Sequence, residues 1–360
     1  MQHCRNDVRP DLNGLPPEQS GASAWRSPPL AASDQWIVNL SPGNVDELVR
    51  ATNAVIARDF DPARLTALNF PLPTLAAELD SLRDELLHGR GFALLRGLPI
   101  GRFTRREVAT LFIGLGAHLG RARSQNAKGH LLGHVCDLGL ASSDPNVRIY
   151  QTHERQTFHT DSCDVVGLLC LREARSGGDS LLVSAAAIFN EMRARRPDLL
   201  ARLLLPMAHD RRGEVPAGMK PWFELPVFIW HAGELTVFYQ RQYIDSAQRF
   251  PDAPQLTGDD VEALDLFDAL ANDPQLHLTM RLAPGDIQFV HNHTLLHDRT
   301  AFVDWPEPNR RRHLLRLWLA CPGARALPPA FAARYGSIEV GDRGGIVAPG
   351  TQLNVPLEPS

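Results

Sequence analysis

Short apolar segments follow one another from Tyr150 onward, and they lack the regular alternation with helices that a parallel α/β sheet requires. The pattern predicts strands at 165–171, 180–183, 227–231, 235–239, 287–290 and 313–320. Helical patterns interrupt these strands at 184–196 and 257–272. This order favours an antiparallel sandwich or jelly roll over a Rossmann sheet, so the expected fold class is mainly β with helical insertions.

Helical patterns dominate the part of the chain before these strands. Apolar periodicity predicts helices at 44–59 and 74–89, and a third helix begins at a capping box formed by Thr104 and Glu107. Between the last two helices, the segment GFALLRGLP is bounded by glycine and proline and predicts one short strand.

The chain is expected to divide into three parts. Residues 1–30 are rich in Pro, Gly, Ser and Gln and predict a loosely ordered N-terminal arm. Residues 31–335 are expected to form a single domain. Residues 336–360 are rich in glycine and proline and predict a tail or a lid.

Composition excludes several classes of protein. The chain has 360 residues, of which 44% are hydrophobic, and a formal net charge of -4, so no nucleic-acid partner is expected. It contains neither an apolar run of membrane-spanning length nor the start of a signal peptide. The five cysteines include no C-x-x-C pair, which indicates a reduced, cytoplasmic protein. Self-association into a homo-oligomer is left open.

Two residues that favour metals precede an apolar strand in the segment QTFHTDSCDVVGLLCL. Side chains two positions apart in a strand leave from the same face, so His159 and Asp161 are expected to point the same way. An imidazole and a carboxylate are two members of the 2-His-1-carboxylate triad that binds iron(II). An ordinary polar pair at a strand entrance has the same pattern, so the motif requires a third ligand.

The third ligand is sought in DIQFVHNHTLLHDRTAF, which contains His291, His293 and His297. His297 is the expected ligand, and the other two are interpreted as polar residues of a turn. A helical zinc pair is disfavoured because no glutamate follows His293, as H-E-x-x-H would require. Because ligating imidazoles must be neutral, iron binding is expected to weaken as pH falls through the imidazole range.

Two arginines lie on an otherwise apolar strand in NRRRHLLRLWLA. If the strand begins near Arg312, then Arg312 and Arg316 share one face with Trp318, and the opposite face is core. A buried guanidinium needs an anion, and its planar fork matches a carboxylate, so a dicarboxylic cosubstrate is the natural partner. An internal salt bridge to a distant Asp or Glu is the alternative for each arginine.

Taken in order, FHTD, SGGDSLLVS, LLH and RRHLLR resemble the motifs of the taurine dioxygenase-like (TauD/TfdA) iron(II)/2-oxoglutarate-dependent oxygenases, over roughly residues 91–320. The resemblance implies a double-stranded β-helix, a jelly roll with a cupin-like core, as the fold of the oxygenase domain. It implies that His159, Asp161 and His297 bind iron and that Arg312 binds the distal carboxylate of 2-oxoglutarate. Arg316 would face the same pocket and contact either the other carboxylate of 2-oxoglutarate or an anionic group of the substrate. Ser180 would also contact 2-oxoglutarate.

The activity implied by the resemblance is oxidation of an unactivated C–H bond of a small molecule, with release of succinate and CO2. The carboxylate of Asp161 implies hydroxylation, desaturation or ring formation rather than halogenation. An amino acid or a specialised metabolite is the expected substrate. The alternatives are a metal-dependent hydrolase or isomerase on a cupin-like barrel, which would not need Arg312 and Arg316, and a non-catalytic binding relative.

Five residues are candidates for substrate contacts. Gln125 and Asn126 lie on a glycine-broken loop where amides could bond a polar substrate group, although a surface turn is an equally good interpretation. Tyr150 and Gln151 shortly precede the metal pair and are expected at the mouth of a pocket. Tyr239 ends a predicted strand and is expected to reach the same pocket.

Overall fold

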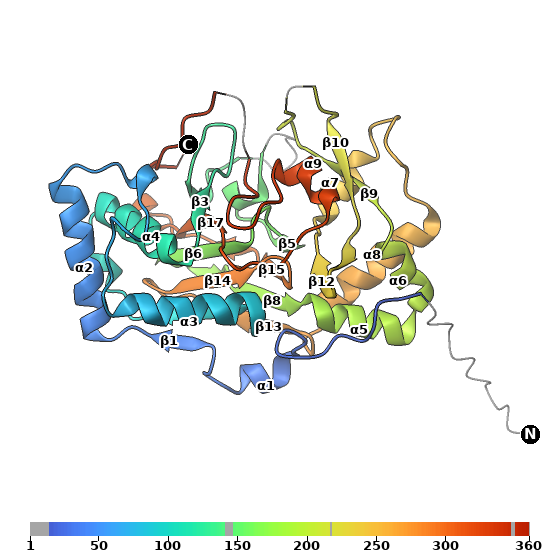
Figure 1. Cartoon of the computed structure of the whole chain (residues 1–360), viewed down its shortest axis with the longest axis horizontal. Helices are drawn as coiled ribbons and strands as arrows, with labels where there is room; N and C mark the ends of the chain where they lie inside the picture. The colour runs from blue at the N-terminus through green and yellow to red at the C-terminus, as the bar shows by residue number, and fades with distance from the viewer. Residues whose placement is uncertain (1–13, 141–146, 217, 347–349, 360) are drawn as a thin grey trace, which may run out of the picture.

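Two sheets form the centre of the protein in a computed structural model, which describes residues 14–140, 147–216, 218–346 and 350–359 (Figure 1). The larger sheet has the order β1 (Ile37–Asn39), β2 (Phe92–Arg96), β14 (Ile287–His291), β6 (Val165–Arg172), β17 (His313–Ala320) and β3 (Arg121–Arg123), with β4 (Leu132–Val135) also paired to β17. The smaller sheet has the order β13 (His277–Met280), β8 (Ser180–Ser184), β15 (Leu295–Arg299) and β5 (Gln156–His159). Within these sheets only the β1–β2 pair is parallel among the described strands.

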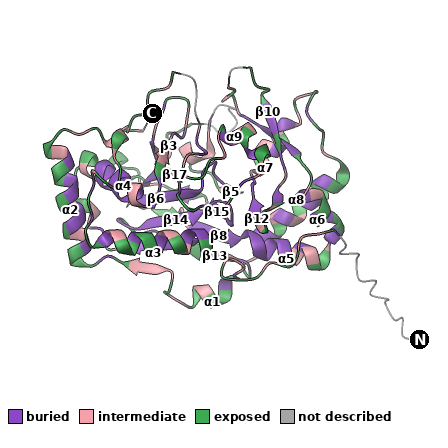
Figure 2. Cartoon of the chain, viewed as in Figure 1, coloured by how far each residue is buried: buried purple, intermediate pink, exposed green. Residues whose placement is uncertain are grey.

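Apolar side chains from both sheets meet in one buried cluster, which shows that the sheets pack face to face. Phe92, Val166 and Trp318 come from the larger sheet, and Leu182 and Leu295 come from the smaller one. Full burial of such a side chain stabilises the fold by about 1.5–3 kcal/mol. Figure 2 shows the strands at the centre as mostly buried, with exposed residues concentrated on the outer helices and loops.

Helices cover the two sides of this sandwich. A first group packs on the larger sheet: α2 (Pro42–Ala57), α3 (Leu75–His88) and α4 (Arg105–Leu119). A second group packs beside the smaller sheet, on the opposite side of Figure 1: α5 (Ala185–Arg195), α6 (Pro197–Leu203) and α8 (Gly258–Ala271). Capping boxes fix where two helices begin, at Ser41 and Asn44 for α2 and at Thr104 and Glu107 for α4.

Shorter elements connect these layers. Two hairpins are formed by β9 (Met207–Asp210) with β10 (Trp222–Leu225) and by β11 (Phe228–His231) with β12 (Glu234–Val237). A third small pair joins β7 (Ser176–Gly177) to β16 (Phe302–Val303). The remaining α-helices of the described chain are α1 (Ser27–Ala31), α7 (Arg241–Ala247) and α9 (Ala332–Tyr335), and 3-10 turns lie at 62–64, 100–102, 149–151, 308–310 and 329–331.

The helices and strands expected from the sequence are confirmed to within a few residues at each end. The expected fold class is confirmed in part: the structure has many strands, but helices and sheets are mixed in it. Helices α6 and α7 were not expected from the sequence, because each spans only 7 residues, which is too short to show a helical period. In the part of the chain that the structure describes, every helix is too short or too polar to cross a bilayer.

Residues 14–31, in the second half of the expected N-terminal arm, are held against the sandwich. The backbone N–H of Gln19 donates to Asn190 Oδ1 at 2.8 Å, and Trp25 Nε1 donates to the carbonyl of Arg90 at 3.0 Å. The ring of Trp25 packs against Phe92 at 5.5 Å between centroids. Residues 1–13 of that expected arm, which include Cys4, lie outside the described residues.

Asp164 is a buried carboxylate that ties the C-terminal segment to the entrance of β6. Its Oδ1 accepts hydrogen bonds from Arg343 Nε at 2.8 Å and from His293 Nε2 at 3.0 Å, and its Oδ2 accepts one from the backbone of Cys321 at 2.9 Å. Burial alone would raise the pKa of Asp164, but these donors and the charge of Arg343 lower it. Because Arg343 is fully buried, this contact anchors the first part of the C-terminal segment.

Replacement of Asp164 by Asn should lower the free energy of unfolding by about 3 kcal/mol or more, because it leaves the guanidinium of Arg343 buried without its counter-charge. Guanidinium chloride unfolding of the metal-free protein would measure this change. The matched control is Glu173→Gln, which removes the surface partner of Arg281 and should cost at most about 1 kcal/mol. Equal effects of the two substitutions would contradict the anchoring role of Asp164.

Candidate metal centre and adjoining cavities

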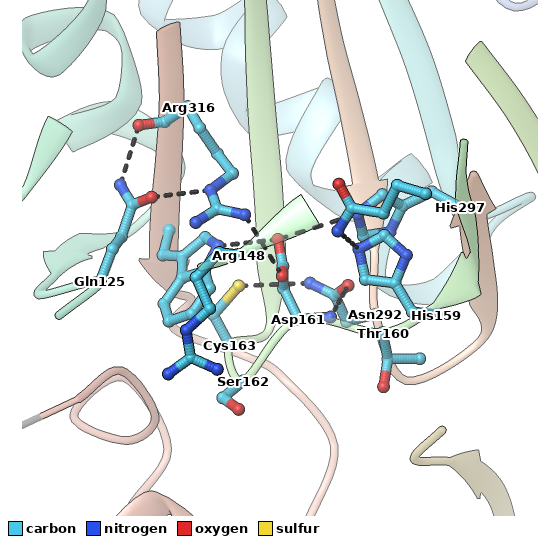
Figure 3. A network of polar contacts seen from close by, with 12 residues as sticks. Gln125, Arg148, His159, Thr160, Asp161, Ser162, Cys163, Asn292, His297 and Arg316 are labelled. Atoms are coloured by element: carbon cyan, nitrogen blue, oxygen red, sulfur yellow. Dashed lines mark hydrogen bonds and ion pairs between the residues drawn. The ribbon is translucent and has the colours of Figure 1, made fainter. Parts of the chain in front are cut away.

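Three potential metal ligands converge between β5 and β15. His159 ends β5 and lies directly opposite His297 in the antiparallel pairing with β15, which places both imidazoles on one face. Asp161 follows the end of β5, where its backbone N–H donates to Asn292 Oδ1 at 2.9 Å. One ligand atom from each of these three buried residues lies within 4.8 Å of the other two (Figure 3).

Hydrogen bonds orient these side chains. His159 Nδ1 donates to the carbonyl of Thr157 at 2.8 Å, so the lone pair is on Nε2. Asp161 Oδ2 accepts from the indole Nε1 of Trp318 at 2.8 Å. His297 Nε2 lies 3.8 Å from Asp161 Oδ2, and its buried Nδ1 has no hydrogen-bond partner among the described residues. Two imidazoles and a carboxylate with free lone pairs suit iron(II) as a donor set.

Gln156 contacts the nitrogen of His159 that the Thr157 carbonyl leaves free. Its side-chain amide donates to His159 Nε2 at 2.9 Å, which is the lone pair that faces the other two potential ligands. Gln156 lines cavities on both sides of the cluster. The sequence analysis missed it because its effect depends on the tautomer of a neighbouring ring.

Electrostatics keep the three residues in their metal-binding forms. Burial lowers the pKa of His297 to about 3, with a further contribution from His159, and burial also lowers the pKa of His159. Burial alone would raise the pKa of Asp161, but the charges of Arg316 and the two imidazoles lower it. Burial therefore favours the neutral, metal-binding form of both imidazoles.

Arg312 is a buried cation beside this cluster, and it has no carboxylate partner among the described residues. Its Nη1 has no hydrogen-bond partner there, and its Nη2 lies 3.4 Å from the carbonyl of Gly178. Burial lowers the pKa of Arg312 to about 10. Gly178 has φ +76° and would place a Cβ 2.8 Å from Arg312 Nε, so only glycine leaves room for this side chain.

A small cavity connects Arg312 with the metal cluster. Its walls include His159, His297, Ser180, Arg312 and Arg316. The hydroxyl of Ser180 donates to Gln288 Oε1 at 3.0 Å. The cavity therefore lies between a cluster that could hold a metal and a guanidinium without an anionic partner among the described residues. A hydroxyl group lies on its wall.

Arg316 differs from Arg312 because an internal partner neutralises it. Its Nη1 lies 3.6 Å from Asp161 Oδ1, and its Nε donates to Gln125 Oε1 at 2.8 Å. The side-chain amide of Gln125 donates to the carbonyls of Leu131 and Arg316. Figure 3 shows this chain of contacts running from Gln125 through Arg316 to Asp161. The internal salt bridge considered from the sequence is thus present for Arg316.

The substrate candidates separate into two groups. Gln125 and Tyr150 line the cavity beside Asp161, and the ring of Tyr150 lies 4.6 Å from the guanidinium carbon of Arg316. Asn126, Gln151 and Tyr239 do not line it, which corrects the expectation for these three.

Each of the three corrected residues has a local structural role instead. Asn126 Oδ1 accepts from the backbone of Lys128 within its own loop. Gln151 Oε1 accepts from the backbone of Arg148. Tyr239 is fully buried, and its hydroxyl donates to Asp268 at 2.6 Å, because the strand register turns this ring into the core beside the smaller sheet.

The cavity beside Asp161 also contains charged residues that were not expected from the sequence: Arg148, Arg212, Glu214 and Arg334. They come from three separate regions, namely the segment before β5, the turn after β9, and α9. No motif or spacing in the sequence links these regions, so only the folded chain reveals this group.

Comparison with known proteins is consistent with this geometry. Residues 44–318 match the sequence profile of the family described as "Taurine catabolism dioxygenase TauD, TfdA family". The chain is 31% identical over 327 residues to FR-33289 synthase of Streptomyces rubellomurinus, which covers 88% of this chain and 95% of that protein. It is 30% identical over 304 residues to taurine hydroxylase-like protein SAT17 of Stachybotrys chartarum, with coverages of 82% and 77%.

Solved structures share the fold. An asparagine oxygenase in complex with Fe(II), hydroxyasparagine and succinate superposes with a TM-score of 0.61 at 16% identity, covering 79% of this chain and 93% of that chain. The non-heme iron oxygenase OrfP in complex with Fe and α-ketoglutaric acid gives a TM-score of 0.57 at 18% identity, with the same coverages.

Lowering the pH should destabilise the metal-free protein. Burial lowers the pKa of His297 and His313 to about 3 and that of His209 to about 4. The unfolded chain binds these protons at a pKa of about 6.5, so the unfolded state holds more protons below that pH. The free energy of unfolding should therefore fall as pH decreases from about 6.5, by up to about 1.4 kcal/mol per pH unit for each histidine.

Denaturant unfolding at pH values between about 7 and about 5 would measure this dependence. His209→Phe removes one buried imidazole from β9. In this variant the slope of the unfolding free energy against pH should decrease by up to about 1.4 kcal/mol per pH unit, the value for one proton. An unfolding free energy that stays constant over this range would contradict the depressed histidine pKa values.

Proposed function

This chain belongs to the TauD/TfdA family and is an iron(II)- and 2-oxoglutarate-dependent oxygenase that acts on a small molecule, and from that premise we propose that His159, Asp161 and His297 bind the iron. The proposal is supported by the convergence of their ligand atoms within 4.8 Å and by the unpartnered Nδ1 of His297. Three protein ligands leave three positions of an octahedral iron free for cosubstrate and oxygen.

Arg312 is proposed to hold the distal carboxylate of 2-oxoglutarate, with Ser180 as a further contact. The single observation that carries this proposal is that Arg312 is buried and has no acidic partner among the described residues. A guanidinium buried in this way is costly unless an anion joins it, and a carboxylate matches its planar fork. The cavity that joins it to His159 and His297 supports a cosubstrate lying between the two.

The packed sheets are proposed to form a double-stranded β-helix with a cupin-like core. Support comes from their shared apolar core and from the almost wholly antiparallel pairing. In this arrangement the metal ligands lie on the smaller sheet, and Arg312 enters from the beginning of β17 on the larger one.

When bound, iron(II) together with 2-oxoglutarate and oxygen supplies the oxidation of an unactivated C–H bond, with release of succinate and CO2. The protein's own contribution is positional. Trp318 and Arg316 hold the carboxylate of Asp161 ionised and oriented, and the carbonyl of Thr157 fixes the tautomer of His159. Hydroxylation, desaturation and ring formation are all compatible with these residues.

The substrate is proposed to be an amino acid or a specialised metabolite that enters the cavity beside Asp161. That cavity is open to solvent-facing residues such as Gln242 and contacts two of the proposed iron ligands, His159 and Asp161. A hydrolase or isomerase that uses the same metal would not require an unpaired Arg312. Metal-dependent turnover without oxygen uptake would favour that alternative.

The substitution Arg312→Gln should weaken 2-oxoglutarate binding by at least about tenfold while iron binding is retained, because a charge-assisted bond to the distal carboxylate is lost. Anaerobic titration of the iron-loaded protein, followed by the absorption band of the iron–2-oxoglutarate complex, would measure it. Arg310→Gln is the matched control, since Arg310 is exposed and lies two positions away. Unchanged cosubstrate affinity in Arg312→Gln would remove this role.

The substitution His297→Ala should abolish stoichiometric iron(II) binding, because two ligands remain of three. Metal analysis after anaerobic dialysis would measure iron content, and thermal unfolding would confirm that the variant is folded. His153→Ala is the control, since the side chain of His153 is largely exposed and pairs with Asp137 rather than with a residue of the cluster. Full iron occupancy in His297→Ala would disprove the proposed ligand set.

A further inference from the structure

A group of buried polar side chains lies where the C-terminal segment is anchored at the entrance of β6. Arg343, Tyr335 and His291 are at most 2% exposed, and the side chain of Arg325 is 8% exposed. Several of their buried atoms have no hydrogen-bond partner among the described residues: Nη1 and Nη2 of Arg343, Nε of Arg325, Oη of Tyr335 and Nε2 of His291. Buried polar groups in folded proteins are normally hydrogen-bonded, so this group requires an explanation.

Asp164 and His293 hold three of these side chains together. Arg343 Nε and His293 Nε2 both donate to Asp164 Oδ1, at 2.8 and 3.0 Å. The ring of His293 lies 5.4 Å from the ring of His291 and 6.1 Å from the ring of Tyr335, measured between centroids. The unpartnered atoms of these residues therefore belong to side chains that surround one buried imidazole.

Arg325 reaches the same place from the segment after β17. Its Nη1 donates to the backbone of β12, and this strand is bonded to the carbonyl of His293 through the backbone N–H of Val237, at 3.1 Å. Burial lowers the pKa of His291, and the positive charges of Arg325 and Arg343 lower it further. Both guanidiniums therefore lie close enough to this imidazole to oppose its protonation.

The charges in this group do not balance. Arg343 Nε lies 2.8 Å from Asp164 Oδ1, and Arg325 Nη2 lies 3.5 Å from Glu234 Oε1. The side chain of Glu234 is 42% exposed, so water screens the second pair, whereas Asp164 is fully buried. The two arginines have no other carboxylate partner in the described ranges. The buried part of the group therefore carries a net positive charge, which is costly unless an anion joins it.

The unpartnered atoms select the chemistry of the missing group. Guanidinium N–H groups can only donate, and the hydroxyl of Tyr335 can donate as well. His291 Nδ1 lies 3.2 Å from Thr294 Oγ1, which can donate to it and so leave the proton of the ring on Nε2. A water molecule would complete some of these hydrogen bonds but would bring no charge. A small anion accepts from several donors and also neutralises the excess cation.

We propose that Arg343, Arg325, Tyr335 and His291 form a binding site for a small monovalent inorganic anion of the chloride type. The site is separate from the proposed iron and 2-oxoglutarate sites and does not depend on them. Its residues come from β14, from α9 and from the segments on either side of α9, so a bound anion joins these segments to the sandwich.

The site supports a wall of the cavity beside Asp161. Ile346 lines that cavity and lies three residues after Arg343. Its backbone N–H donates to the carbonyl of Ser124 at 2.7 Å. An anion bound at Arg343 therefore holds the beginning of the stretch that forms this wall.

A crystal of the protein grown in sodium bromide tests the site directly, because bromide can replace chloride and is identified by its anomalous scattering. We expect a bromide ion within hydrogen-bond distance of the Nη atoms of Arg343 and of Tyr335 Oη. Ordered water at this position, or bromide found as an adventitious ion only on exposed arginines, would overturn the proposal.

Thermal unfolding of the metal-free protein tests the site in solution. Sodium chloride replaces sodium gluconate at a constant ionic strength of about 0.15 M. Because an anion that binds only the folded state stabilises it, the unfolding temperature should rise with chloride concentration and then level off. An identical unfolding temperature in the two salts would contradict the site.

Two substitutions distinguish this site from a general effect of the salt. Tyr335→Phe removes one donor, and Arg325→Gln removes one cation, so each should weaken the apparent chloride affinity by at least about tenfold. Tyr239→Phe is the matched control, since it removes a buried hydroxyl that is bonded to Asp268, and it should leave the chloride response unchanged. Equal chloride responses in the wild type, Tyr335→Phe and Arg325→Gln would disprove the site.

Discussion

The pairing of β5 with β15 is the interaction on which the site depends. It sets His159 opposite His297, so two residues that are distant in the chain present imidazoles from neighbouring strands. The same sheet is held to its larger neighbour by a shared apolar core, and Trp318 extends from that core to Asp161. A shift of one residue in the register of β15 would turn His297 to the other face and remove the cluster.

Charge is distributed unevenly around this cluster, and the distribution separates structural from ligand-binding arginines. Arg343 and Arg316 have internal carboxylate partners, Asp164 and Asp161, and they stabilise the architecture of the site. Arg312 has no such partner in the part of the chain that the structure describes, and it is almost completely buried. The folded protein therefore carries an electrostatic cost, and the proposed binding of an anionic cosubstrate at Arg312 would relieve it and so couple cosubstrate binding to stability.

The two cavities give the reaction a spatial order. One joins the metal cluster to Arg312, and the other opens from Asp161 toward Arg212 and Arg334. If cosubstrate and substrate occupy these cavities as proposed, they approach the proposed metal site from different cavities. The wall shared by the two cavities includes Gln156 and Tyr150, which places these side chains between the two ligands.

Local pattern in the sequence was enough to predict seven of the seventeen strands of the described chain, the long helices and the three residues that converge as potential metal ligands, and it singled out Arg312. These features depend on periodicity and on residues that keep their chemical character wherever they lie, such as a cation on an apolar strand. Only the tertiary structure showed that Arg316 pairs with Asp161 and that Arg312 does not, because strand pairing sets the distance from each guanidinium to Asp161. It likewise moved Tyr239 into the core, and it brought Arg212 and Arg334 together from a turn and a short helix that share no sequence pattern. Long-range contacts of this kind arise from the packing of whole sheets and helices, which the local sequence around each residue does not encode.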